Sequence, residues 1–578
     1  MNNPFQFRTD HPFHRIQNPH GSAAFLTEQE VFNLKLNQQG GGNKFCPYLG
    51  FINQNHALFA RKPDSNYYNP NLLEGNGHLL TVAPTRAGKG TGQIIPNLLT
   101  WIGSVLVIDV KGENYLRSAG CRKETLGQTV MRFAPFEQVS NIWNPIQTIR
   151  VDPVQQESTP EEEEDARYLT NLLITPSGSS DSVFWENSAK NFLEGLLLYV
   201  RTAELVTNDS KKQFKVRERS MREVRRLLSL EKDQFSELLN NMAKSEKTLI
   251  REAACNLSRL MAGHGKTGQS ILAVLLEQTS VWAYQRLHRV TYKASEKEND
   301  LEPAENDFSF EQLRNGKTSI YLIIPPDYLT EYRAVLRVMV GCAMREMRVS
   351  FVNHKKSPVS QEKPPVLFIL DEFPQLAYMQ PIEEALLYLA GYDVRFWFFI
   401  QDISQLQLHY KNSWQSFFAN TGTQCFFGVS DIATANLVSE MAGITTTQQT
   451  STNYQCAWNN GEPLYYLSKF DNYFYLMHPN FFDKPASFLQ SSKDGIIYLQ
   501  SKINLNEYYP APNIHVSSTV SNISRPLITP DEVMRLPENE QIVFVKGIKP
   551  ILCYRPACYQ IIGYDSTQID PPEAVDFI

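Results

Sequence analysis

The residues best suited to chemistry lie in a loop rich in small residues between two apolar segments. Leu79, Leu80 and Val82 predict a buried strand, and the apolar positions from 94 to 99 predict a helix. In that geometry the loop N–H groups and the helix N-terminus face an anion, and a lysine reaches the outer phosphates. We therefore predict a phosphate-binding loop for a nucleotide, formed by Pro84, Thr85, Arg86, Ala87, Gly88, Lys89, Gly90 and Thr91.

Two positions of this loop depart from the common pattern G-x-x-x-x-G-K-[ST]. Ala83 stands where the first glycine is usual, and Gly90 stands where a hydroxyl usually binds magnesium. We expect Thr91 to supply that oxygen from one residue further on, or water to take its place. The missing hydroxyl also leaves open a recruitment platform, whose site binds nucleotide and scarcely hydrolyses it.

A second apolar run, at 365–372, closes on the acids Asp371 and Glu372. Beside a nucleotide, the first carboxylate of such a strand binds the metal ion, and the second activates the water that attacks the γ-phosphate. We therefore predict Asp371 as a magnesium ligand, together with Thr91, and Glu372 as the catalytic base. The implied cofactors are ATP and Mg²⁺.

A third apolar run, Val394–Ile400, predicts another buried strand and ends at Gln401. The Gln401 amide is placed to sense the γ-phosphate or to orient water in catalysis. Arg395 lies at the opposite end of the run, where it could reach a neighbouring subunit as an arginine finger. An ordinary surface charge is the alternative for Arg395.

Two charged stretches each keep two interpretations. Asp109 and Lys111 end the predicted strand that starts at Ser104, and they are either ligand-binding residues or turn residues. The stretch Lys211–Arg226 is dense in basic residues and is either a phosphate-binding surface or a solvated helix face.

The composition is that of an ordinary globular protein. Of the 578 residues, 42% are hydrophobic and 20% are charged, and the formal net charge of -6 excludes a surface coated with positive charge for nucleic acid. The eight cysteines include no C-x-x-C pair, which favours a reduced, cytosolic setting without a zinc site. We expect no membrane crossing, because the apolar runs are far shorter than the roughly 20 residues that span a bilayer.

Alternating strand and helix patterns predict an α/β core interrupted by two insertions. Helix periodicity in the first insertion covers Phe184–Val200, Met221–Leu228, Phe235–Met242, Leu249–Met261 and Gly268–Val290. The predicted division is an N-terminal arm at 1–43, a nucleotide-binding domain at 44–160 and 301–445, an all-α domain at 161–300, an aromatic-rich insertion at 446–523, and the C-terminal end of the core with an acidic tail at 524–578.

The aromatic residues of the second insertion have two interpretations. They pack an added β-rich subdomain, or they form a surface for a partner or a nucleic-acid strand. These residues are Tyr465, Tyr466, Phe470, Tyr473, Phe474, Tyr475, Phe481, Phe482, Tyr508 and Tyr509.

Several motifs in a fixed order resemble those of the TraG/TraD type of type IV secretion coupling protein. The resemblance covers roughly residues 45–445 and 520–560. The motifs are Ala83–Gly90, Ile95–Leu99, Asp109–Glu113, Trp143–Pro145, Phe184–Trp185, Leu370–Phe373, Gln401 with Ser404–Leu406, Tyr410, Trp414, Phe418, Asn420 and Arg525–Met534.

This resemblance implies a RecA-like P-loop NTPase core with an inserted all-α domain, assembled as a homo-hexamer. Such proteins recruit a relaxase–DNA complex or a secreted effector to a type IV secretion channel, whose ATPase or inner-membrane components are the implied partners. They use ATP hydrolysis to drive transfer. Lys89, Asp371, Glu372 and Gln401 match the ATPase positions of the family, and Arg395 matches the finger loosely.

Typical members of this family begin with transmembrane helices. Because we expect no membrane crossing in this chain, we expect it to be cytoplasmic and to reach the inner membrane through a partner. A DNA-translocating ATPase that works outside secretion is the alternative within the same class.

Overall fold

A computed structural model of the chain describes residues 21–27, 30, 47–51, 72–74, 77–152, 157–176, 182–206, 213–263, 266–295, 303–354, 364–457, 465–470, 473–477, 513–561 and 564–572. The chain divides into two compact units. The larger unit comprises residues 25–438 and 530–578, and the smaller comprises residues 1–24 and 439–529. Of the predicted N-terminal arm, only residues 21–27 and 30 are described.

An eleven-stranded sheet forms the centre of the larger unit, in the order β2-β1-β15-β14-β9-β3-β8-β7-β4-β6-β5. From β9 to β5 in this order the strands run parallel, and the remaining strands add antiparallel. The strands are β1 (Tyr48–Phe51), β2 (Leu72–Glu74), β3 (His78–Val82), β4 (Val105–Asp109), β5 (Thr129–Phe133), β6 (Thr318–Ile323), β7 (Val366–Leu370), β8 (Val394–Ile400), β9 (Thr421–Phe426), β14 (Glu540–Val545) and β15 (Ile551–Tyr554).

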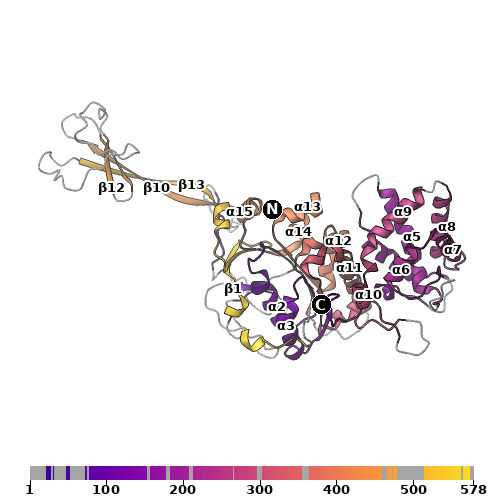
Figure 1. Cartoon of the computed structure of the whole chain (residues 1–578). Coiled ribbons are helices and arrows are strands. Elements are labelled where there is room, and N and C mark those ends of the chain that lie inside the picture. Colours follow the sequence, from indigo (N-terminus) through magenta and orange to yellow (C-terminus); the bar gives the residue numbers. More distant parts are fainter. Residues whose placement is uncertain are drawn as a thin grey trace, which may run out of the picture. The chain divides into compact units, whose positions relative to one another are not determined.

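Helices cover this sheet, as Figure 1 shows. Helices α2 (Ile95–Thr100) and α3 (Glu113–Glu124) pack on one face, where Leu98 and Tyr115 join a buried cluster with side chains of β3, β4, β6, β7 and β8. The helices between β6 and β9 follow strands that step in the opposite direction across the sheet, so right-handed crossovers place them on the other face. They are α11 (Leu329–His354), α12 (Gln380–Tyr388), α13 (Ile403–Tyr410) and α14 (Gln415–Asn420).

The three predicted strands that end at chemical residues are all present. Every residue of β4, β7 and β8 is buried. Burial on both faces explains their continuous apolar sequences, because a parallel strand covered by helices has no solvated side. The predicted α/β class is confirmed.

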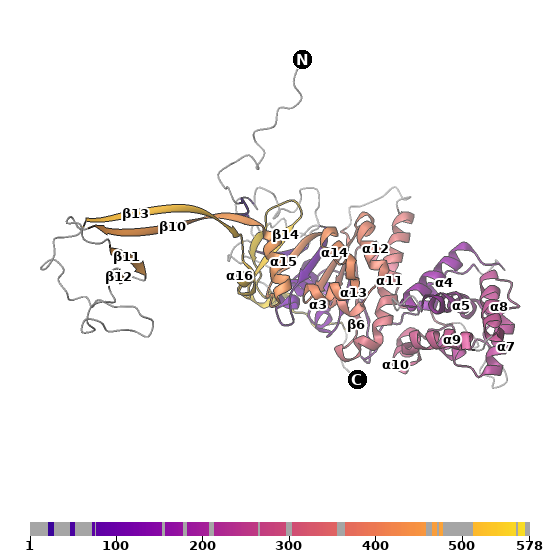
Figure 2. The same cartoon turned by 90° about the horizontal axis from the view of Figure 1, so that it is seen from above.

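The helical insertion contains α4 (Pro160–Leu173), α5 (Val183–Thr202), α6 (Met221–Leu228), α7 (Lys232–Met242), α8 (Thr248–Gly263), α9 (Lys266–Gln278) and α10 (Gln285–Thr291). Helix α5 packs against α4, α8 and α9. These helices appear in purple and magenta in Figures 1 and 2. Helix α4 begins with a capping box between Thr159 and Glu162, with Pro160 at its first position.

The prediction of one helix over Gly268–Val290 is wrong. Helix α9 ends at Gln278, a 3₁₀ turn spans Ser280–Ala283, and α10 begins at Gln285. The turn buries Val281 and Trp282, and Tyr284 is extended with ψ of 133°. Burial of the large indole thus redirects the chain where helical periodicity alone predicts continuity.

The smaller unit contains a four-stranded antiparallel sheet in the order β12-β11-β10-β13. Strands β10 (Ile444–Ala457) and β13 (Asn513–Pro526) pair along their whole length, and Figure 2 shows them as a long ribbon. Tyr465, Tyr466 and Phe470 lie on β11 (Tyr465–Phe470), and Tyr473, Phe474 and Tyr475 on β12 (Tyr473–Met477). Phe481, Phe482, Tyr508 and Tyr509 lie outside the described residues.

Two further α-helices are α15 (Ile432–Ala442) and α16 (Pro530–Met534). Within the described ranges, no helix has both the length and the apolar sequence needed to cross a bilayer.

Candidate nucleotide site

The predicted site residues follow neighbouring strands at one edge of the parallel sheet. Strand β3 pairs with β8, β8 with β7, and β7 with β4. The register places Val82 beside Ile400 and Leu370 beside Phe398, so the loops after these strands leave the sheet at the same edge. Carboxyl ends of parallel strands are the usual location of ligands in α/β sheets.

The phosphate loop runs from Ala83 to Lys89 between β3 and a helical segment. The Ala83 N–H donates to the Ile400 carbonyl, which fixes the start of the loop against β8. Gly88 has φ of +84°, a conformation that glycine adopts without steric cost, and Arg86 has φ of +66°. The chain then enters one π-helical turn at Gly90–Ile94, which continues into α2. This is the strand, loop and helix arrangement that the sequence predicts.

Three predicted site residues, the phosphate-binding Lys89 and the catalytic Glu372 and Gln401, form a continuous chain of contacts. The Lys89 ammonium lies 3.4 Å from Glu372 Oε1, and it also donates to the Ala83 carbonyl over 3.1 Å. Gln401 Nε2 donates to Glu372 Oε2 over 3.0 Å. Positions 89, 372 and 401 therefore meet at one point, although 283 positions separate the first two.

Asp371 lies immediately beside this chain, in an electrostatic setting that suits a cation. The pKa of Asp371 is raised to about 7, chiefly by burial and then by the carboxylates of Glu372 and Asp109, whereas Lys89 acts in the opposite direction. A divalent cation with oxygen ligands would relieve this repulsion. The donor set therefore fits Mg²⁺.

In the described part of the chain, no three His, Cys, Asp or Glu side chains are close enough to hold a metal ion. Magnesium bound to nucleotides commonly uses one or two carboxylates with phosphate oxygens and water. Asp371 fits the role of that single carboxylate.

Asp109 supports the loop that follows its own strand. Its Oδ2 accepts the Tyr115 N–H over 2.8 Å, at the start of α3. Burial raises the pKa of Asp109 to about 6, while backbone N–H groups that bond its carboxylate act in the opposite direction. Lys111 is exposed. The structural interpretation of Asp109 thus has direct contacts, and its charge also reaches Asp371.

Two predicted residues are not joined to this cluster. A Cβ atom at Gly88 would lie 3.4 Å from Thr91 Oγ1 and 3.0 Å from a guanidinium nitrogen of Arg555, so the Thr91 hydroxyl lies on that flank of the loop. Arg395 lies at the amino end of β8, opposite Gln401, and is 8% exposed. There it lies near His78, whose pKa it lowers.

The remaining loop residues surround Lys89 with different exposure. Thr85 and Arg86 are exposed, Pro84, Ala87, Gly88 and Gly90 are half-buried, and Lys89 is buried. An added Cβ at Gly90 would meet no atom within 4 Å. Space for a side chain therefore exists at the position where a hydroxyl is usual.

Arg555 is a contact residue of the loop that the sequence did not reveal. Its guanidinium donates to the carbonyls of Ala87 and Gly88, over 3.0 Å in each case. Arg555 directly follows the short strand β15, more than 460 positions from the loop. The one local signal is Gly92, an unexpected glycine in a helical pattern, whose place for a Cβ is filled by Arg555.

Two arginines of the basic stretch that ends at Arg226 bind backbone carbonyls. Arg226 donates to the carbonyls of Gln213 and Lys215 and pairs with Glu223, and Arg219 donates to the carbonyls of Val200 and Arg201. Lys211 and Lys212 lie outside the described residues. For these two arginines, the contacts favour a structural role over phosphate binding.

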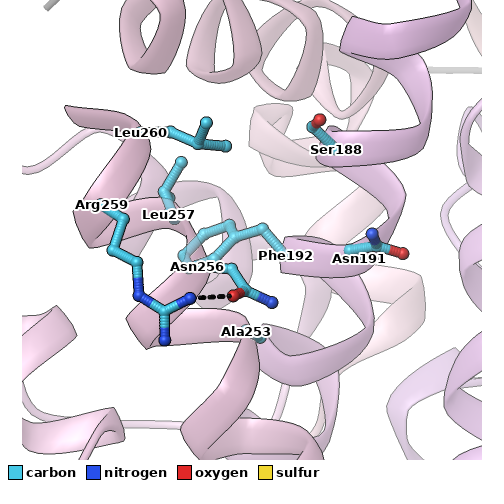
Figure 3. Close-up of a pocket in the computed structure, with 8 residues that line it drawn as sticks. All are labelled: Ser188, Asn191, Phe192, Ala253, Asn256, Leu257, Arg259 and Leu260. Carbon is cyan, nitrogen blue, oxygen red and sulfur yellow. Dashed lines mark hydrogen bonds between the residues drawn. The ribbon is translucent and has the colours of Figure 1, made fainter. Parts of the chain in front are cut away.

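A pocket of about 270 Å³ lies between α5 and α8 (Figure 3). It is lined by Ser188, Asn191, Phe192, Ala253, Asn256, Leu257, Arg259 and Leu260. None of the predicted site residues lines it. Arg259 donates to Asn256 over 3.3 Å at its rim.

Comparison with known proteins gives a consistent set of relatives. The family model described as "Type IV secretory system Conjugative DNA transfer" matches residues 47–462 and 512–575. Protein VirD4 of Rhizobium radiobacter is 30% identical over 450 residues, which cover 75% of this chain and 59% of VirD4. Conjugal transfer protein TraG of Escherichia coli is 28% identical over 390 residues, which cover 65% of this chain and 56% of TraG. The chain thus matches less than two thirds of the length of these relatives.

Solved structures agree on the fold. The bacterial conjugative coupling protein TrwB, lacking its first residues, superposes with a TM-score of 0.56 at 12% identity, and the match covers 93% of this chain and 95% of that one. TrwB in complex with ADP and Mg²⁺ gives a TM-score of 0.50 at 12% identity, over 85% of this chain and 88% of that one. The RecA-like P-loop NTPase fold predicted from the motifs is therefore confirmed. The chain belongs to the family of type IV secretory system conjugative DNA transfer proteins.

Proposed function

We propose that this protein is a magnesium-dependent ATPase that couples substrates to a type IV secretion or conjugation apparatus. The observation that carries the proposal is the contact chain from Lys89 through Glu372 to Gln401, with Asp371 beside it. A lysine, two acids and an amide at the ends of neighbouring strands are the groups that phosphoryl transfer to water needs. TrwB, a coupling protein of similar fold, binds ADP and Mg²⁺ in the solved complex.

Each group has a specific role in this proposal. The N–H groups of residues 87–91 and the Lys89 ammonium bind the β- and γ-phosphates. Asp371, with Thr91 or water, holds Mg²⁺, which neutralises charge on the phosphates when bound. Glu372 accepts a proton from the attacking water. Gln401 holds the Glu372 carboxylate by its hydrogen bond and orients that water or senses the γ-phosphate.

The resemblance to the family supports a proposal for the assembly and the partners. The proposed substrate is a relaxase–DNA complex or a secreted effector, and the proposed partners are the channel ATPase or inner-membrane components of the apparatus. A homo-hexameric ring is proposed on the same ground. Within a ring, Arg395 would act as the finger for a neighbouring site only if the amino end of β8 faced that site.

Two substitutions test the proposal directly. Lys89→Ala removes the phosphate cation, and Glu372→Gln keeps the shape of the base without its charge. We expect both variants to lose ATP turnover by about 100-fold or more, and substrate transfer to recipient cells with it, while keeping the wild-type melting profile. Transfer at the wild-type rate in either variant would refute the proposal.

A second candidate function has one observation in its favour. Gly90 offers no hydroxyl, and the Thr91 hydroxyl lies on the Arg555 flank of the loop. A platform that binds nucleotide but scarcely hydrolyses it fits this arrangement. Steady-state ATP turnover with and without single-stranded DNA separates the two, because strong stimulation by DNA excludes the platform.

A further inference from the structure

We propose that Arg555 is a positioning residue that fixes the phosphate loop through the carbonyls of Ala87 and Gly88. The inference rests on the proposed nucleotide site and assigns a part of it to the last strands of the chain. Nothing in the motif around Lys89 requires such a residue.

Arg555 is held on several sides in a buried position. Its Nη1 donates to the Gly88 carbonyl over 3.0 Å, and its Nη2 donates to the Ala87 carbonyl over 3.0 Å and to the Glu538 carbonyl over 2.7 Å. The guanidinium lies 3.8 Å from the centre of the Phe427 ring. Arg555 is 4% exposed, so it occupies a fixed place under the loop.

Glycines make room for this side chain. A Cβ at Gly92 would lie 2.0 Å from Arg555 Nη1 and 3.1 Å from its Cγ and Cδ. A Cβ at Gly88 would lie 3.0 Å from the same Nη1. A side chain at position 92 would collide with the buried guanidinium, so Arg555 requires glycine there. This accounts for a glycine inside a helix, where alanine is otherwise more favourable.

The contacts determine where the loop N–H groups point. In a trans peptide the C=O and N–H bonds point in opposite directions. When Arg555 binds the carbonyls of Ala87 and Gly88, the N–H groups of Gly88 and Lys89 are directed away from it. These are two of the N–H groups assigned to the phosphates, so Arg555 sets the direction of the donors before a nucleotide binds.

The charge of Arg555 adds to this effect. Burial lowers the pKa of Arg555 to about 10, which leaves it protonated at neutral pH. The partners of its guanidinium are carbonyl oxygens and a ring face, and no salt bridge among the described residues includes it. A cation without a bound carboxylate beneath the loop favours an anion above it.

A second contact joins the same hairpin to the helix after the loop. Gln541 on β14 accepts from Gln93 Nε2 over 2.9 Å, and Gln93 in turn accepts from Thr81 on β3 over 2.8 Å. Strands β14 and β15 pair with each other. The hairpin and the residue that follows it therefore contact two neighbouring parts of the site. Arg555 binds the loop at residues 87–88, and Gln541 binds the helical turn after the loop at residue 93.

Binding of N-methylanthraniloyl-ADP in the presence of Mg²⁺ tests the inference on the full chain. We expect Arg555→Ala to raise the dissociation constant by roughly 10- to 100-fold, because charge-assisted hydrogen bonds to the loop are lost. Arg555→Lys keeps the charge without the planar fork, so we expect a loss of about threefold or more. Arg535→Ala, which alters an exposed arginine that reaches only Asp531, serves as the control and should bind like wild type.

Chemical rescue separates positioning from a general loss of structure. A few millimolar guanidinium should restore tight binding to Arg555→Ala by entering the vacated space, and should leave Arg555→Lys unchanged. The inference would be overturned if the dissociation constant of Arg555→Ala lay within about twofold of wild type. It would also be overturned if that constant were raised and guanidinium did not lower it again. If Arg555→Ala does not fold, wild-type binding by Arg555→Lys overturns it instead. Failure of the wild-type protein to bind the probe would refute the proposed function itself.

Discussion

At the scale of single residues, the Lys89 ammonium is shared between two acceptors, one in its own loop and one in the proposed base. Its ammonium contacts the Ala83 carbonyl and Glu372 Oε1. Glu372 also accepts from Gln401 Nε2 at its other oxygen, Oε2. Under the proposed function, a nucleotide that breaks the contact between Lys89 and Glu372 Oε1 would leave that oxygen free to accept from the attacking water.

Gly90→Ser tests whether the missing hydroxyl limits the metal site. Because a Cβ at position 90 meets no atom within 4 Å, we expect the variant to keep the wild-type melting temperature. We expect it to lower the Mg²⁺ concentration for half-maximal ATP turnover by about fivefold, in line with one added hydrogen-bonding or ligating oxygen. Magnesium titrations of turnover measure this.

Gly90→Ala is the matched control, since it adds the Cβ without the oxygen. Equal magnesium dependence in Gly90→Ser, Gly90→Ala and wild type would show that the hydroxyl at this position is dispensable, with water or Thr91 in its place.

At the scale of elements, β3 and β8 are tied together at the end opposite the site by His78. Its Nδ1 accepts the Phe396 N–H over 3.0 Å. His78 is 2% exposed, and burial, with a smaller contribution from Arg395, lowers its pKa to about 4. Protonation of Nδ1 would remove this acceptor, so the neutral ring is the folded form.

The lowered pKa of His78 predicts the direction in which the stability of the fold changes with pH. The pKa of His78 is lower in the folded chain than the value of about 6.5 expected when unfolded, so the unfolded state takes up the proton first as pH falls. Stability from this group is present above pH 6.5 and is lost between about pH 6.5 and pH 4. We expect about 2 kcal/mol of it to be lost by pH 5.

Chemical denaturation of the larger unit at pH 7 and pH 5 measures the loss, with His78→Asn as the comparison. Asparagine keeps an acceptor for the Phe396 N–H but does not titrate, so the variant should lose less stability on acidification. Parallel losses in both proteins would exclude His78 as the cause.

The elements that position the site could be predicted from the sequence because their signals are local. The buried runs that became β7 and β8 end directly at Glu372 and Gln401, one or two residues past the strand. Their meeting with Lys89 follows from adjacency of the strands at one sheet edge, which the phosphate-loop pattern implies.

The features of the fold and the site that could not be predicted from the sequence depend on contacts between distant segments. Arg555 follows an antiparallel strand at the far side of β9, and no local pattern reports which loop such a strand will support. The break between α9 and α10 depends on a place for Trp282 among other helices, which periodicity does not encode. Thr91 follows Lys89 by two residues, and its side-chain direction depends on the local π-helical turn.

At the scale of the larger unit, a buried acid on α4 joins the helical domain to the core. Asp165 is 2% exposed and accepts from Arg150 over 2.8 Å and from Arg345 on α11. The Tyr168 hydroxyl donates to the Gly341 carbonyl over 2.8 Å, one turn away on the same two helices. The α4 and α11 contact is thus built from charge and hydrogen bonds as well as from packing.

Asp165→Asn should loosen this junction. The substitution leaves Arg345, which has only 12% of its side chain exposed, without its carboxylate, and unpaired buried charges cost about 3 kcal/mol or more. We expect a lower melting temperature and faster proteolysis between the core and the helical domain, with nucleotide affinity unchanged. Arg535→Ala, at an exposed ion pair with Asp531, is the control and should change neither.

The affinity of the chain for ATP with and without Mg²⁺, measured by calorimetry in wild type, Asp371→Asn and Lys89→Ala, tests most directly whether the loop and the acidic strand end serve one nucleotide. The account predicts that Mg²⁺ tightens ATP binding by wild type, that Asp371→Asn loses this effect but keeps metal-free binding, and that Lys89→Ala binds weakly in both conditions. Full magnesium enhancement in Asp371→Asn, or undiminished ATP binding by Lys89→Ala, would contradict it.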